Sequence, residues 1–542
     1  GRGTDSLAVR SIPLPEPGPR QILARVDAAG ICTSVNKLID QGAEHPLAHG
    51  WDPALHPVTV GDEGLVTIVE IGAELRDHWY VGQRCAVQPA VDIAPINHLE
   101  RYADNGRGVA SGRIGATAMS TILPGAVGPI PAEMRAIVLS GRGTDSLAVE
   151  TIPVPKPGAR QVLARIDAAG ICTSVNKLID QGAQHPLAHG WDPAQHPVTV
   201  GDEGVVTVVD VGEELRDEWS VGQRCAVQPA VDIAPINHLE RYADNGRGVV
   251  KVAVGYSLPG LLAEYILITE EVLEAGCLLR LPSDDLPAGH AGIAEPISCI
   301  ISSHAHHMHL SQPDRTKART ATTGLKPGGV TVIIGAGPMG RIHVDLAIAA
   351  RPRAIIATAR RQERLDWLHT TFGARAEAAG VELITVNATT GDLAATVREV
   401  SDDAGADDLI VTAADRALME SVQHLLARYG VLDLFAGLKP GEEIIGIDER
   451  FVHYQEINIT GSSGGGPWDV IETLRLMAAG EIDAAAHIGH VGDLDHAPEL
   501  LGMARDGRVQ GKAIVYPHRR AEAIATVARW TTEDEQRYLA GG

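Results

Sequence analysis

The sequence predicts an α/β protein in which a mainly β module is followed by a doubly wound parallel sheet. Short apolar runs that end in glycine fill residues 158–212, and strand-like and helix-like segments alternate from residue 328 onward. Such alternation is typical of a parallel sheet with helices on both faces. A third observation concerns the domain organisation, because residues 1–109 reappear almost unchanged as residues 141–249.

The repeat has no gaps and copies one whole module. At a constant offset of 140 positions, only 16 of the 109 residues differ. The second copy follows a strand-like segment, MRAIVLS, and runs on into further strands, so we expect 134–542 to form a complete unit and 1–112 a partial module. The Gly-, Pro- and Ala-rich segment 113–133 is typical of a linker. The sequence leaves open whether the first copy is a genuine fusion, a duplication remnant or an artefact of the gene model.

Charge and cysteine usage exclude some classes of function. The net charge of −23 opposes binding to nucleic acid and to anionic membrane surfaces, because phosphates would be repelled. No apolar run approaches the roughly 20 residues that span a bilayer. The six cysteines are scattered and form no C-x-x-C pair, which favours reduced thiols and a cytoplasmic protein.

The strands and helices follow from the apolar pattern. The β module has its clearest strands within 158–170 and 198–212, each closed by glycine. The later strands are expected at 354–359, 382–387, 408–414, 430–437 and 457–463. Two of the intervening helices are expected at 392–405 and 414–430. The first strand of this parallel sheet precedes a glycine-rich turn.

That turn reads G-x-G-x-x-G and contains Gly335, Gly337, Pro338, Met339 and Gly340. A buried-strand pattern precedes it and a helical pattern follows it, the context in which the motif predicts dinucleotide binding. Unpaired N–H groups and the positive dipole end of the helix would then face the pyrophosphate. An ordinary glycine-rich turn between strand and helix is the alternative.

The residues after the next strand bear on the choice of cofactor. NAD enzymes carry an acidic residue about 20 positions beyond the glycines, where it binds the ribose hydroxyls. This sequence has Ala359 there, followed by Arg360 and Arg361. Two guanidinium groups would pair with a 2′-phosphate, so we expect NADP(H) rather than NAD(H). The alternative is that both arginines form a solvated start of a helix.

Seven motifs together carry a resemblance to a known family: GICTSVNK, HPVTVGDEGVVTVVDVG, VGQRCAVQP, AEPIS, GAGPMG, YQEINITGSSG and GKAIVYP. They resemble the zinc-type medium-chain alcohol dehydrogenases, in particular the polyol and sugar(-phosphate) dehydrogenase branch. The resemblance covers 134–542 and implies a GroES-like β-barrel catalytic domain at 134–300 and a Rossmann domain at 301–465. Residues 466–542 would return to the catalytic domain, and 1–112 would be a duplicated partial GroES-like module.

The resemblance also implies a catalytic zinc. Cys172 matches the family's G-I-C cysteine, Glu203 the acid of G-H-E, and Glu295 the acid of the E-P element, whereas Asp202 replaces the histidine of G-H-E. Thiolate and carboxylate are both acceptable zinc ligands, so these four residues are the expected metal and catalytic set. Alternatives stay open: the metal is lost, Cys172 is a core thiol, Asp202 and Glu203 form a solvated turn, or His189 or His196 supplies the missing ligand.

Two other groups of residues bear on metals. The segment 230–248 lacks the four cysteines of the family's structural zinc lobe, so no structural zinc is expected. The tract of His304, His306, His307 and His309 could bind a metal, but we expect an exposed or interdomain helix there.

The implied reaction is hydride transfer between NADP(H) and a secondary alcohol or carbonyl of a small polyol, sugar or sugar phosphate. Ser174 matches the family's proton-relaying hydroxyl, whereas Val175 and Lys177 depart from the family's pattern. Alternatives are a zinc-independent NADPH-dependent carbonyl or enoyl reductase and a catalytically dead nucleotide-binding assembly protein. We also expect a homo-oligomer, either a dimer or a tetramer.

The first copy should be catalytically silent. It repeats the cysteine, serine and two acids of the second copy as Cys32, Ser34, Asp62 and Glu63. It has neither an E-P acid nor a cofactor domain of its own, so it lacks the remaining parts of the site.

Overall fold

A computed structural model describes residues 17–19, 21–29, 64–76, 79–82, 84–87, 129–188, 191–232, 251–314, 316–439 and 441–540. The chain divides into two compact units, Gly1–Ile122 and Leu123–Gly542. Among the described residues, every helix is too short or too polar to cross a lipid bilayer. Most of the predicted linker, like Cys32, Ser34, Asp62 and Glu63, lies outside the described residues.

The described part of the first unit is a three-stranded antiparallel sheet in the order β1–β2–β3. Its strands are β1 (Ile22–Ala29), β2 (Gly64–Ile71) and β3 (Arg84–Val87). Ile22 pairs with Ile71, and Gly64 pairs with Val87. The corresponding residues of the second copy pair in the same way, Val162 with Val211 and Gly204 with Val227. The sequence repeat is therefore matched by the same strand register; that 1–112 form a partial GroES-like module stays a prediction.

The two copies differ in how well this sheet is covered. Val26 of β1 is 63% exposed, whereas Ile166, its counterpart in the second copy, is fully buried. Val69 is 42% exposed and its counterpart Val209 only 6%. At these two positions the first unit therefore exposes apolar side chains that the second copy buries.

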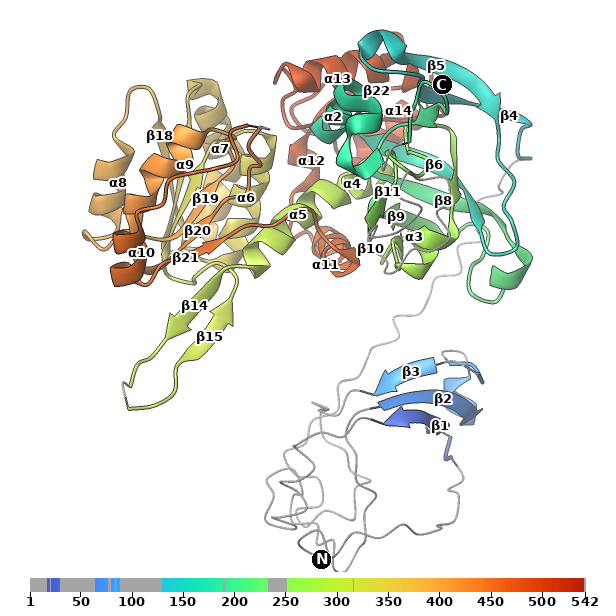
Figure 1. Ribbon diagram of the computed structural model, residues 1–542, viewed down its shortest axis with the longest axis horizontal. Helices are drawn as coiled ribbons and strands as arrows, with labels where there is room; N and C mark the ends of the chain where they lie inside the picture. Colours follow the sequence, from blue (N-terminus) through green and yellow to red (C-terminus); the bar gives the residue numbers. More distant parts are fainter. Residues whose placement is uncertain are drawn as a thin grey trace, which may run out of the picture. The chain divides into compact units, whose positions relative to one another are not determined.

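The second unit begins with a β barrel built from an eight-stranded sheet and two smaller sheets (Figure 1). The eight-stranded sheet contains β6 (Val162–Gly170), β8 (Gly204–Val211), β9 (Arg224–Val227), β12 (Tyr265–Ile268), β13 (Leu278–Arg280), β22 (Ile488–Gly492), β23 (Lys512–Val515) and β24 (Ala525–Thr526). The smaller sheets are formed by β4 (Glu133–Leu139), β5 (Leu147–Pro153) and β7 (Val198–Thr199), and by β10 (Ala230–Asp232) and β11 (Lys251–Ala253). Strand β23 pairs with β6, so the C-terminal segment rejoins the sheet of the second copy.

Residues 330–460 form the predicted doubly wound sheet, whose six parallel strands have the order β18–β17–β16–β19–β20–β21. The strands are β16 (Val330–Ile334), β17 (Ala354–Ala359), β18 (Glu382–Asn387), β19 (Ala406–Val411), β20 (Leu426–Asp433) and β21 (Asn458–Thr460). Helices α6 (Pro338–Ala350) and α7 (Gln362–Ala378) pack on one face, and α8 (Leu393–Val400) and α9 (Arg416–Val422) pack on the other. Helix α10 (Glu449–Gln455) precedes β21. The hairpin of β14 (Met308–Ser311) and β15 (Thr320–Thr323) projects from one end of the sheet (Figure 1).

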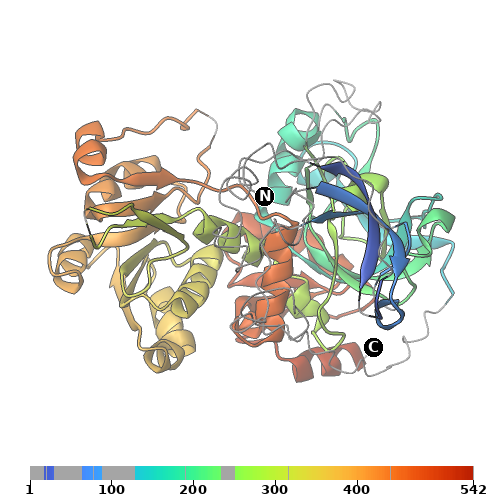
Figure 2. The ribbon, with the colours of Figure 1, turned by 90° about the horizontal axis from the view of Figure 1, so that it is seen from below.

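Helix α5 (Ala294–Ala305) runs from the barrel to the parallel sheet, so the predicted boundary at residue 300 falls inside one continuous helix (Figure 2). Its buried side packs with α6 and with α11 (Pro467–Ala478) in a core that also includes β23. The other α-helices in the described part of the second unit are α2 (Thr173–Gln181), α3 (Glu270–Glu274), α4 (Ala288–Ala291), α12 (Ala484–His487), α13 (Ala497–Arg505) and α14 (Thr532–Ala540).

Several predicted elements differ in extent from the observed ones, and the helix over 414–430 differs most clearly. The expected helix over 414–430 ends at Val422, and residues 426–430 already belong to β20. Leu426 pairs with Ala406, and Tyr429 adopts a left-handed backbone conformation with a φ of 65°. Pairing with β19 therefore places residues 426–430 in a strand, although their local sequence predicts a helix.

Candidate functional site

Cys172, Asp202 and Glu203 lie together where two strands of the second copy end. Cys172 follows β6 as the residue that caps α2, and Asp202 and Glu203 lie in the connection between β7 and β8. One ligand atom of each residue lies within 4.8 Å of those of the other two. Gly170 makes room for this group, because a Cβ there would lie 2.4 Å from Oε2 of Glu203.

Hydroxyl groups surround the carboxylate of Asp202. Ser174 Oγ lies 2.6 Å from Asp202 Oδ2 and 2.7 Å from Cys172 Sγ, and the hydroxyl of Tyr256 donates to Asp202 Oδ2 over 3.0 Å. The single hydroxyl proton of Ser174 can go to the thiol sulfur or to the carboxylate, but not to both. Ser174 therefore bridges two of the predicted metal ligands.

A buried lysine completes the group. Lys512 on β23 donates to Glu203 Oε1 over 2.6 Å, and both side chains are almost fully buried. Burial alone would lower the pKa of Lys512, but the charge of Glu203 and its hydrogen bond to the ammonium group raise it above its usual range. Lys512 therefore stays protonated beside the acidic cluster.

Glu295 in the first turn of α5 approaches the group but is not one of its three clustered donors. Burial and the nearby charges of Glu203 and Asp202 raise the pKa of Glu295 to about 8. The thiol of Cys299, one turn further along α5, lies 3.5 Å from Glu295 Oε1. The structure thus brings Cys172, Ser174, Asp202 and Glu203 into contact and couples Glu295 to them electrostatically.

The residues present fit a divalent cation. Oδ1 of Asp202 and Oε2 of Glu203 are buried and have no hydrogen-bond partner among the described residues. Burial and the charges of Asp202 and Glu203 raise the pKa of the Cys172 thiol well above its usual value, so a cation is what would favour its thiolate. Two unpaired carboxylate oxygens and one sulfur are an acceptable donor set for zinc, with Lys512 balancing only part of the negative charge.

The glycine-rich turn between β16 and α6 has the geometry that its sequence predicts. Gly335 has a φ of 108°, which favours glycine, and a Cβ on Gly340 would lie 1.9 Å from the carbonyl oxygen of Gly335. Gly337 caps α6, and Pro338 and Met339 begin the helix. A Cβ on Gly337 would lie 3.7 Å from its nearest neighbour, the guanidinium of Arg364, which is an ordinary van der Waals contact without a clash.

Arg360 and Arg361 are exposed at the end of β17, where they lead into α7. Arg361 lines a pocket with Pro338, Arg341, Glu363, Arg364 and Trp367 on one side and 507–511 on the other. The guanidinium of Arg341 lies 4.0 Å above the Trp367 ring. Burial, and then the positive charges of Arg361 and Arg360, lower the pKa of Arg364, so this pocket concentrates positive charge beside the glycine-rich turn.

Several of these residues were missed by sequence reasoning. Lys512 lies within the GKAIVYP motif, but nothing in the local sequence connects it to Glu203, and Tyr256, Arg341 and Arg364 carry no motif of their own. Of the two histidines considered as substitute ligands, His196 is exposed and packs against Trp191, and His189 lies outside the described residues. Most of the segment expected to lack a structural zinc also lies outside them.

Comparisons with known proteins agree with this arrangement. The family model for the alcohol dehydrogenase GroES-like domain matches residues 158–276, and that for zinc-binding dehydrogenases matches 338–479. The chain is 31% identical to mannitol-1-phosphate 5-dehydrogenase of Aliivibrio fischeri, over 69% of this chain and 85% of that protein. It is 27% identical to L-sorbose 1-phosphate reductase of Klebsiella pneumoniae, over 69% of this chain and 86% of that protein.

A solved structure shares the fold. The 2R,3R-butanediol dehydrogenase of Bacillus subtilis superposes with a TM-score of 0.56 at 22% identity, covering 71% of this chain and all of that one. The glycine-rich turn, the clustered thiol and carboxylates and these relatives lead to one conclusion. The chain belongs to the zinc-type medium-chain alcohol dehydrogenases, in their polyol and sugar dehydrogenase branch, and is an NAD(P)-dependent oxidoreductase that acts on a small molecule.

Proposed function

We propose that the chain transfers a hydride between NADP(H) and a secondary alcohol or carbonyl of a polyol, sugar or sugar phosphate, with one divalent metal ion, zinc by preference. The observation that carries the metal is the pair of buried, unpartnered oxygens on Asp202 and Glu203 beside Cys172. A sugar phosphate is favoured because the relatives named above act on mannitol 1-phosphate and L-sorbose 1-phosphate.

The residues of the chain have separate roles in this proposal. Cys172, Asp202 and Glu203 would hold the metal, and the electrostatically coupled Glu295 could join them. When bound, the metal polarises the substrate oxygen and the nicotinamide exchanges the hydride. Ser174, within hydrogen-bonding distance of both Cys172 and Asp202, is the hydroxyl that accepts and passes on the substrate proton.

The preference for NADP(H) rests on charge. Arg360 and Arg361 stand where NAD enzymes of this fold carry an acid, and Arg364 adds a third guanidinium nearby. Guanidinium groups pair well with a phosphate, whereas the ribose hydroxyls of NAD give them no anionic partner. A cytoplasmic location and assembly into a homodimer or homotetramer belong to the same proposal.

The test is a dehydrogenase screen of the full-length protein against polyols, sugars and sugar phosphates with both cofactors. We expect turnover of a sugar phosphate or polyol with NADP(H), loss of that activity after chelation, and recovery with zinc. Full activity after chelation would favour a zinc-independent carbonyl or enoyl reductase. Binding of NADP(H) without turnover of any of these substrates would contradict the proposed reaction.

A further inference from the structure

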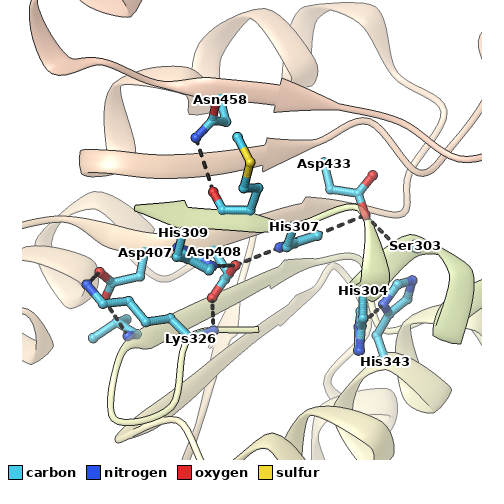
Figure 3. Close-up of polar contacts among 12 residues, drawn as sticks. Ser303, His304, His307, His309, Lys326, His343, Asp407, Asp408, Asp433 and Asn458 are labelled. Carbon is cyan, nitrogen blue, oxygen red and sulfur yellow. Dashed lines mark hydrogen bonds and ion pairs between the residues drawn. The ribbon is translucent and has the colours of Figure 1, made fainter. Parts of the chain in front are cut away.

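A second group of metal-ligating side chains lies in the parallel sheet, apart from the Cys172 cluster. His307, which follows α5, places Nδ1 2.6 Å from Oδ1 of Asp408 on β19. His309 on β14 places Nε2 2.9 Å from the same oxygen. The three ligand atoms lie within 4.8 Å of one another, and the three side chains are buried (Figure 3).

Further contacts orient these side chains from outside. The other ring nitrogen of His307, Nε2, lies 3.3 Å from Oδ2 of Asp433, and Ser303 donates to that same carboxylate oxygen (Figure 3). The second oxygen of Asp408 accepts the backbone N–H of Lys326 over 2.8 Å. Histidines that bind metals commonly donate their remaining N–H to a carboxylate in this way, which fixes the ring and its tautomer.

These contacts can be satisfied either with or without a cation between the rings and Asp408, and the two states differ in where the protons lie. Without one, both histidines must donate to a single oxygen of Asp408, and His307 must carry protons on both nitrogens to donate also to Asp433. With a divalent cation, His307 is neutral: Nε2–H donates to Asp433 and the lone pair of Nδ1 binds the metal. Nδ1 of His307, Nε2 of His309 and Oδ1 of Asp408 would then each bind the metal. The charge of the metal would balance the negative charges of the Asp408 and Asp433 carboxylates.

The ligand types select the class of metal. Two imidazole nitrogens and one carboxylate oxygen suit zinc and similar transition metals, whereas magnesium and calcium prefer oxygen ligands alone. Zinc bonds of roughly 2.0–2.1 Å in a tetrahedral site separate the ligand atoms by about 3.3 Å. From 2.9 Å and 2.6 Å, His309 and His307 would therefore need to move away from Asp408 by about 0.4 Å and about 0.7 Å.

We propose that His307, His309 and Asp408 form a second, non-catalytic binding site for a divalent transition metal, zinc by preference. The bound ion would fix the residues that follow α5 and the first strand of the β14–β15 hairpin to β19. This site shares no residue with the Cys172 cluster, so the inference is independent of the proposed function.

Zinc per chain, measured by elemental mass spectrometry on the full-length protein, tests the site. We expect His309→Ala to remove one zinc ion per chain, Cys172→Ser to remove a different one, and the double variant to bind none. His306→Ala is the matched control, because His306 belongs to the same histidine tract but is exposed, and it should retain the wild-type content. If His309→Ala keeps as much zinc as the wild type, the second site is wrong.

A second measurement detects metal binding in the Cys172→Ser background, so that the test does not depend on zinc content alone if a variant folds poorly. Cobalt added to the metal-free Cys172→Ser protein should give d–d absorption without a thiolate charge-transfer band, and zinc should raise its melting temperature. Both effects should be absent in Cys172→Ser/His309→Ala. A Cys172→Ser protein that binds neither ion would overturn the inference, whereas a wild type whose only zinc is lost in His309→Ala would support it and contradict the catalytic zinc.

Discussion

Lys512 donates a hydrogen bond to Glu203 over 2.6 Å, although 309 positions separate the two residues in the sequence. The pair joins β23, near the end of the chain, to the connection that leads into β8, and both side chains are buried. This contact brings the last part of the chain to the candidate active site, because β23 also pairs with β6.

We expect Lys512→Met to destabilise the protein by about 3–5 kcal/mol, because it leaves the Glu203 carboxylate buried without its partner. Lys512→Met/Glu203→Gln should recover much of this loss, since it removes both charges. Denaturant unfolding of the metal-free single and double variants measures the difference. Additive losses in the double variant would show that the two charges are not energetically coupled.

The residues that form the sites show what the sequence could reveal. Cys172, Ser174, Asp202 and Glu203 were identified from short motifs, and the structure places them together. Their partner Lys512 was missed, because only folding brings it close. His307 and His309 were expected in an exposed or interdomain helix, but they are buried against Asp408, about 100 positions further along the chain. A local pattern cannot reveal such a partner.

The sequence predicts two strands of the parallel sheet with the bounds that the structure has. The predicted strands 354–359 and 382–387 coincide with β17 and β18. The helix predicted over 414–430 was too long, because its last residues, LARYG, pair with β19 and form the first part of β20. Tertiary pairing overrides local propensity at that position.

The glycine-rich turn offers a comparison between two of its own glycines. Gly340→Ala should prevent correct folding of the turn, because its Cβ would lie 1.9 Å from a backbone oxygen. Gly337→Ala should fold normally, because its Cβ would meet nothing closer than 3.7 Å, but it should weaken cofactor binding by occupying space beside the helix N-terminus. Thermal unfolding and cofactor titration separate the two effects. Equal melting temperatures for both variants would contradict the steric argument.

Replacement of both Arg360 and Arg361 by alanine should raise KM for NADP(H) by roughly tenfold or more, the equivalent of about 1.4 kcal/mol. KM for NAD(H) should change little, since NAD lacks the 2′-phosphate. Arg353→Ala is a suitable control, because Arg353 pairs with Asp402 elsewhere on the same sheet. Steady-state kinetics with both cofactors provide the measurement, and an equal change for both would argue against a phosphate contact.

The two copies of the module should respond differently to the same substitution. Cys172→Ser should reduce kcat by at least about 10²-fold, because it removes a sulfur donor from the clustered site. Cys32→Ser, the equivalent change in the first copy, should leave kcat and KM unchanged. Assays of the two full-length variants under the same conditions test this, and a comparable loss in both would mean that the first copy contributes to catalysis.

A buried histidine makes the stability of the parallel sheet depend on pH. His343 on α6 is fully buried; its Nδ1 lies 3.0 Å from Nε2 of His304, and its ring packs edge-on against Phe435. Burial, followed by the neighbouring His304, lowers the pKa of His343 well below 6.5. In the unfolded chain the same imidazole titrates near its usual value of about 6.5. Below that pH the unfolded state therefore binds a proton that the folded state does not.

The stability that His343 contributes is therefore present above about pH 6.5. It is lost as the pH falls below that value, by at most about 1.4 kcal/mol per pH unit. His343→Gln stays neutral, so its free energy of unfolding should fall less than that of the wild type between pH 7 and pH 5. Denaturant unfolding in the presence of a chelator measures this without a contribution from metal release. The exposed His306→Gln should follow the wild type, and parallel curves for His343→Gln and the wild type would show that His343 is protonated equally in both states.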